Sequence, residues 1–209
     1  MNPQSLELLQ RADDKSIDLL LARIPHRWSA QWQDREICSE ADDFLSLCSK
    51  KVHRWFILAV PPLEFDVWQH HSMRHNLRYI RAGVWLHTES YLAANGAHHI
   101  IPPSGFDVLY IGYGTANRSI WYGGGKAGTW LAPDTQDGVL SPMLIESCID
   151  AFTQIGERVA VCDGSDVEAV ADIIHRSRRV DIDTIVENAI SAATRKKSVL
   201  IDMFAEQSE

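Results

Sequence analysis

The sequence predicts an α/β domain with a mostly parallel central sheet that helices cover on both faces. Continuous apolar runs of strand length, such as residues 55–60, are typical of strands that are buried on both sides. Segments with helical periodicity or helix-capping signals, such as residues 39–49, lie between these runs. Because strands and helices alternate along the chain, parallel strands connected by helices are favoured.

Each expected element depends on a local signal. Strands are expected where apolar, β-branched or aromatic residues cluster, at 17–22, 55–60, 77–86, 108–113, 158–162 and 178–183. Helices are expected at 5–11, 39–49, 142–156, from 165 onward and at about 184–195. Proline after Ser141 and the S-x-x-E box that begins at Ser165 mark two helix starts, and Gly156 marks an end.

The composition predicts a globular chain of one domain. The chain has 209 residues, of which 45% are hydrophobic and 23% charged. No apolar run reaches the roughly 18 residues of a membrane helix, and the first residues are polar and acidic, so we expect a cytoplasmic protein without a membrane partner. A net charge of −8 argues against a strongly basic nucleic-acid binder. The four cysteines lack C-x-x-C spacing and are expected to be reduced core residues.

One segment has the layout of a nucleotide-type cofactor site. A strand ends in Asp163-Gly164-Ser165, a capped helix follows, and a second strand ends at Asp183. The turn after the first strand would lie under the ligand, and the acid 20 residues later would accept hydrogen bonds from ribose hydroxyls. The alternative is an ordinary turn in which Ser165 is only a helix cap.

Two further segments are candidates for contacts with nucleic acid. A glycine-rich loop carries Trp121, Lys126 and Trp130, which could stack on bases and contact phosphate, or could simply pack over the sheet edge. A second segment gathers His70, His71 and His75. His71 and His75 are spaced to bind a metal from one helical face, but the sequence fixes no third ligand, so we predict no metal site there.

The order of these features resembles the DNA amino-methyltransferases, the adenine-N6 or cytosine-N4 type, in the permuted class whose catalytic strand precedes the cofactor strand. Residues 14–26 resemble the strand that ends in D-P-P-Y, and residues 81–89 an R-x-G-x-W strand. Residues 104–130 resemble the segment with the N-G-G-G loop, 137–152 the H-P-T-Q-K-P segment with its helix, and 153–183 the cofactor half. The resemblance is closest to compact phage-type members and implies a Rossmann-like fold that uses S-adenosylmethionine.

The resemblance divides the single domain, residues 1–209, into a catalytic-strand half (about 1–130), a cofactor-type half (about 131–195) and a tail (196–209). It also places the D-P-P-Y motif at Arg23-Ile24-Pro25-His26. In the family the first residue of the motif accepts hydrogen bonds from the amino group of a flipped base, and the aromatic residue stacks on that base. Guanidinium only donates, and its charge opposes a cationic sulfonium.

The cofactor positions depart from the family as well. The segment after Asp163 is shorter than the family's, and Asp166 replaces a glycine near the methionine carboxylate of the cofactor, which would repel it. Only Pro142 survives from H-P-T-Q-K-P, while Asp163 and Asp183 keep the ribose-side acids. Two further replacements put His87 where the family has lysine and Asp107 where it has glutamate.

The sequence therefore favours a degenerate DNA methyltransferase-like protein, phage-encoded and without methyl transfer, that acts by binding DNA, a homologous subunit or a host defence factor. A homodimer is one state it could adopt, and no cofactor is expected unless the S-adenosylmethionine pocket still functions. Two alternatives stay open. The chain could be a divergent active methyltransferase, or an acidic interaction protein with no ligand.

Overall fold

The computed structural model describes residues 9–28, 36–88, 105–114, 128–135, 138–154, 156–164, 172–173 and 184–186. The strands are β1 (Ile17–Arg23), β2 (Val52–Val60), β3 (Arg78–His87), β4 (Phe106–Tyr113), β5 (Thr129–Ala132), β6 (Val159–Cys162) and β7 (Thr184–Val186). The helices are α2 (Ser39–Lys51), α3 (Phe65–Arg74) and α5 (Pro142–Phe152), with short 3-10 turns at His26–Trp28 and Pro62–Glu64.

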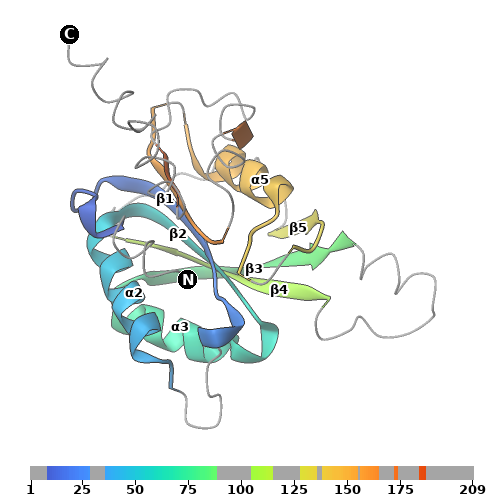
Figure 1. Ribbon diagram of the computed structural model, residues 1–209, viewed down its shortest axis with the longest axis horizontal. Helices are drawn as coiled ribbons and strands as arrows, with labels where there is room; N and C mark the ends of the chain where they lie inside the picture. Colours follow the sequence, from blue (N-terminus) through green and yellow to red (C-terminus); the bar gives the residue numbers. More distant parts are fainter. Residues whose placement is uncertain are drawn as a thin grey trace.

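The seven strands form one mixed sheet in the order β5-β3-β4-β2-β1-β6-β7. The pairs β1–β2, β1–β6, β6–β7 and β3–β5 are parallel, whereas β4 runs antiparallel to both β2 and β3. Helices α2 and α3 lie on one side of the sheet and α5 lies on the other (Figure 1). The predicted α/β class with a mostly parallel, doubly covered sheet is confirmed.

The central strands have two buried faces because both helical layers pack on them. In β1, Leu19 and Leu21 face the α5 layer, and Ile17 and Leu20 face the α2/α3 layer; all four are at most 2% exposed. On the α5 side, Trp55 meets Phe152 edge-on at 4.9 Å between ring centroids. This double burial explains why β1 and β2 are continuous apolar runs rather than alternating ones.

The expected strands in β1, β2, β3, β4 and β6 are confirmed to within a few residues, as is the helix at α2. The start of α5 is confirmed too, with Ser141 in the N-cap position and Pro142 in the first turn. Proline is favourable there because its missing N–H would have no partner inside the helix. The hydroxyl of Ser141 does not cap the helix.

The sequence analysis missed α3 and β5. Helix α3 buries Val67, Trp68, His71 and Ser72, so half of its inward positions carry polar side chains and the apolar pattern is hidden. Strand β5 is four residues long and mostly accessible, which is too short for its alternation to be recognised.

Two expectations at the level of single elements were wrong. Helix α5 ends at Phe152 with Thr153 as its C-cap, so Gly156, which has a φ of +84°, belongs to the following turn and does not end the helix. A helix was expected from about Thr184, but Thr184–Val186 is strand β7. All three residues of β7 are β-branched, which favours extended backbone over helix. The strand expected at 178–183 lies outside the described residues.

Three of the four cysteines behave as expected, because Cys48, Cys148 and Cys162 are buried in the two hydrophobic layers without disulfides. Burial raises the pKa of the Cys48 and Cys148 thiols, so these groups stay neutral. Cys38 is exposed, so its assignment to the core was wrong. Among the described residues, no helix is long and apolar enough to cross a bilayer.

Candidate functional site

The sheet register brings the carboxyl ends of β1, β2, β3 and β6 and the first residues of β4 to one edge. The carboxyl end of β1 lies between those of β2 and β6, since Arg23 pairs with Ala59 and Ala22 with Cys162. Strand β4 is antiparallel, so its first residues lie at the same edge, where Asp107 pairs with Trp85 near the end of β3. Ligands of open α/β sheets bind at the carboxyl ends of the strands, so this edge is the candidate site.

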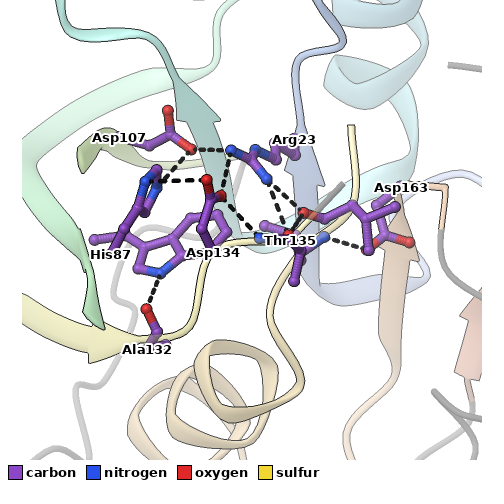
Figure 2. A network of polar contacts seen from close by, with 10 residues as sticks. Arg23, His87, Asp107, Ala132, Asp134, Thr135 and Asp163 are labelled. Atoms are coloured by element: carbon purple, nitrogen blue, oxygen red, sulfur yellow. Dashed lines mark hydrogen bonds and ion pairs between the residues drawn. The ribbon is translucent and has the colours of Figure 1, made fainter. Parts of the chain in front are cut away.

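Arg23 lies at the centre of this edge and is surrounded by acceptors (Figure 2). One terminal nitrogen donates to the hydroxyl of Thr135 at 3.0 Å and to the carbonyl of Val139 at 2.8 Å. The other forms ion pairs with Asp107 at 2.9 Å and with Asp134 at 3.4 Å. Only 12% of the Arg23 side chain is exposed.

Trp85 and His87 complete the wall of this cluster on the β3 side. The Arg23 guanidinium carbon lies 4.6 Å from the ring centre of Trp85, which gives a cation–π contact. The indole N–H of Trp85 donates to the carbonyl of Ala132 at 3.2 Å, which fixes the ring. The two ring nitrogens of His87 lie 3.6 Å from Asp107 and 3.6 Å from Asp134, so the imidazole lies between two carboxylates.

A short segment, the strap, crosses the ends of β1 and β6. We define it as the described residues Asp134, Thr135 and 138–140. Asp163 at the end of β6 is 1% exposed, and its carboxylate accepts the backbone N–H of Leu140 at 2.8 Å. The N–H of Gly164 donates to the carbonyl of Gly138 at 3.0 Å. The strap is thus held by Arg23 on one side and by Asp163 on the other (Figure 2).

The other expected D-P-P-Y and cofactor positions contribute differently. Ile24 and Pro25 are buried, and Gly138 has a φ of +74° and lies against Pro25. His26 begins the 3-10 turn after β1, and its side chain lies outside the described part of the structure. Pro142 is in the first turn of α5, directly after the strap. Ser165, Asp166 and Asp183 lie outside the described residues.

The nucleic-acid candidates that the structure describes contact other parts of the chain. Trp130 is partly buried and stacks on Phe152 at 6.4 Å, so it packs over the sheet near its edge. His71 and His75 both approach Asp42 of α2, with His75 at 2.8 Å and His71 at 3.7 Å. His70 is exposed beside them, and Trp121 and Lys126 lie outside the described residues.

The sequence analysis did not predict the cluster around Arg23. It gave His87 and Asp107 only as departures from a motif, and it did not name Asp134 or Thr135. Asp134 is 111 residues from Arg23. The segment after β5 shows only an Asp-Thr pair in a connection that leads to the helix cap at Ser141, which is common in ordinary loops.

No protein-family model matches the sequence, and no curated protein sequence matches it either. Solved structures do match. The PvuII DNA methyltransferase, described as cytosine-N4-specific, has a TM-score of 0.63 at 13% identity, covering 87% of this chain and 78% of that one. A protein described as a DNA modification methylase from Thermus thermophilus, in complex with S-adenosyl-L-methionine, has a TM-score of 0.62 at 11% identity, covering 87% and 84%.

A third structure, the complex of M1.HpyAVI with SAM, has a TM-score of 0.61 at 8% identity and covers 89% of this chain and 90% of that one. At such low identity the likeness concerns the path of the backbone, not the chemistry of the site. The matches nevertheless cover 87% to 89% of this chain and 78% to 90% of the three neighbours. This chain therefore has the fold of the DNA amino-methyltransferases.

Proposed function

We propose that this chain is a methyltransferase-fold protein that does not transfer methyl groups and acts by binding, with DNA or a protein as its partner. Arg23 carries the proposal. In the resemblance it occupies the position whose side chain accepts hydrogen bonds from the amino group of the target base. A guanidinium has donors only and cannot take that role. Its contacts with Asp107, Thr135 and Val139 hold it in place, so it does not simply swing away.

The positive charge of Arg23 supports the loss of methyl transfer less strongly than its lack of a hydrogen-bond acceptor does. Two carboxylates, from Asp107 and Asp134, lie against the guanidinium and offset its positive charge. The repulsion between Arg23 and the cationic sulfonium of S-adenosylmethionine would therefore be partly cancelled. The missing acceptor is not restored at position 23 itself, because a guanidinium has donors only.

The contacts of Asp163 also support loss of the reaction. The resemblance assigns the Asp163 carboxylate to the cofactor side. In the structure this carboxylate is buried and accepts the backbone N–H of Leu140 in the strap. One of its oxygens is therefore already engaged within the chain.

A divergent active methyltransferase is the second candidate. It is favoured by the retention of an acid, Asp163, directly after β6, and by structural neighbours that were solved as complexes with S-adenosylmethionine. In that case Pro25 and His26 would hold the base, and Asp163 and Asp183 the cofactor. The acidic composition, with a net charge of −8, is compatible with a third candidate, a protein-binding module without a small ligand.

Methyl transfer from labelled S-adenosylmethionine to DNA tests the proposal directly. The PvuII methyltransferase serves as a positive control for the assay. We expect no incorporation with the wild-type chain. Incorporation that disappears in Arg23→Ala or Asp163→Asn, but persists in the exposed neighbour Arg27→Ala, would overturn the proposal. Arg23→Asp with Ile24→Pro asks whether an acceptor alone restores transfer; it will not if the cofactor side is also disabled.

Two binding measurements separate the three candidates. Calorimetric titration with S-adenosylmethionine is expected to show no binding, whereas tight binding would favour the enzyme. DNA binding whose affinity falls as salt rises, without cofactor binding, supports the proposed binding role. Absence of both supports the interaction protein.

A further inference from the structure

We propose that the carboxyl edge of the sheet contains a binding site for a planar guanidinium group, that Arg23 fills this site from within the chain, and that its occupancy fastens the strap. The site consists of Asp107, Asp134, Trp85, Thr135 and the carbonyl of Val139. This inference goes beyond the proposed function, since it concerns what the cluster recognises and holds, whether or not methyl transfer survives.

The cluster matches the donors of a guanidinium group. One terminal nitrogen of Arg23 donates to Thr135 and Val139, and the other donates to Asp134 and forms an ion pair with Asp107. The four oxygens thus approach two separate nitrogens of one planar group, and the centre of the Trp85 ring lies 4.6 Å from the central carbon. An ammonium group has three donors on a single nitrogen and no plane to stack, so it cannot satisfy this arrangement.

Two parts of the site, Trp85 and Asp107, belong to the sheet, and the other three belong to the strap. Trp85 in β3 is fully buried and pairs in register with Asp107 in β4. The ring of Trp85 is fixed by its bond to Ala132 in β5. Shortening the Arg23 side chain should therefore leave Trp85 and Asp107 in place and open a space of guanidinium size beside them. Such a space keeps a buried carboxylate that needs a cation.

The strap depends on the occupant of this site. Arg23 contacts the strap at Asp134, Thr135 and Val139, and hydrogen bonds at Leu140 and Gly138 join the strap to the end of β6. The Asp134 side chain is 45% exposed and lies 3.6 Å from His87, so Arg23 and His87 hold this end of the strap. Occupancy of the guanidinium site should therefore set how often the strap opens.

Chemical rescue tests the inference. In Arg23→Ala, hydrogen exchange measured by NMR should show protection of the Leu140 and Gly164 amides reduced by about tenfold or more, while central strand amides change less. Guanidinium chloride at about 50 mM, far below denaturing concentrations, should restore that protection. Ammonium chloride at the same ionic strength should not. Asp107→Asn added to Arg23→Ala should abolish the rescue, and Arg27→Ala should behave as wild type.

Unchanged protection in folded Arg23→Ala, no rescue, or equal rescue by ammonium would each overturn the inference. If Arg23→Ala does not fold in buffer, circular dichroism and thermal unfolding replace the exchange measurement. Low guanidinium concentrations should then promote folding or raise the Tm of the variant, because a ligand that binds only the native state stabilises it. The same additions should lower the Tm of the wild type. A uniform decrease in both proteins would refute the proposed site.

Discussion

The ion pair between Arg23 and Asp107 should make the candidate site one of the costliest places in the molecule to disrupt. The two side chains are only 12% and 10% exposed, and their atoms are 2.9 Å apart. Arg23→Ala leaves the Asp107 carboxylate buried without its principal cation, which typically costs about 3–5 kcal/mol. Asp134→Asn touches a carboxylate that is 45% exposed and 3.4 Å from Arg23, so it should cost less than about 1 kcal/mol.

Urea unfolding followed by tryptophan fluorescence measures these free energies, and a double-mutant cycle isolates each pair. We expect the coupling of Arg23 with Asp107 to exceed the coupling with Asp134 by more than about 1 kcal/mol. The exposed Arg27→Ala serves as the matched arginine control and should change the free energy of unfolding by less than about 0.5 kcal/mol. A cost below about 1 kcal/mol for Arg23→Ala, or equal coupling to both aspartates, would refute the view that burial sets the strength of this cluster.

Three other predictions concern the fold that supports the site. Phe152→Ala empties a fully buried position and should lower the free energy of unfolding by about 3–5 kcal/mol in urea titration; a loss under about 1 kcal/mol would contradict the packing. Gly114→Ala places a Cβ 2.2 Å from the carbonyl oxygen of Val52. The substitution should lower the free energy of unfolding by more than about 1 kcal/mol in thermal unfolding. A neutral effect would show that Gly114, directly after β4, does not approach the start of β2 so closely. The hydrogen bond to His75 lowers the pKa of Asp42 below its ordinary value of 3.8. The stability that this hydrogen bond adds is fully present above that value and is lost as pH falls through the lower pKa of the folded state. The wild type should therefore lose more stability than Asp42→Asn between about pH 5 and 3. The difference should be less than about 1 kcal/mol, because the carboxylate is half exposed. Equal losses in the two proteins would rule out this contribution.

In the structure, Arg23 has a structural role in addition to its lack of a hydrogen-bond acceptor. From the sequence it was a residue that replaced an acceptor, and its effect was limited to loss of a reaction. In the structure it is also the residue that ties β1 to β3, β4 and the strap through Trp85, Asp107 and Val139. Arg23 is therefore a structural element of this edge, at the position where the resemblance places the first residue of D-P-P-Y.

Local signals were sufficient for most of the fold. Double burial makes β1 and β2 continuous apolar runs, and proline after Ser141 marks the start of α5, so the sequence alone predicts these elements. The sequence did not predict an element where tertiary contacts, rather than the local residue pattern, determine its structure. Helix α3 hides its periodicity because His71 and Ser72 are buried, and the buried environment is not visible along the chain.

For the candidate site, the sequence by itself determined the positions at the ends of β1 and β6, Arg23 and Asp163, because strand ends can be located from apolar runs. It also determined that a donor stands where an acceptor is expected. Only the tertiary structure decided what Arg23 binds. Asp107 reaches Arg23 from the antiparallel strand β4, and Asp134 reaches it from the segment after the edge strand β5. The order and register of strands so far apart in the sequence are set by long-range packing rather than by local sequence.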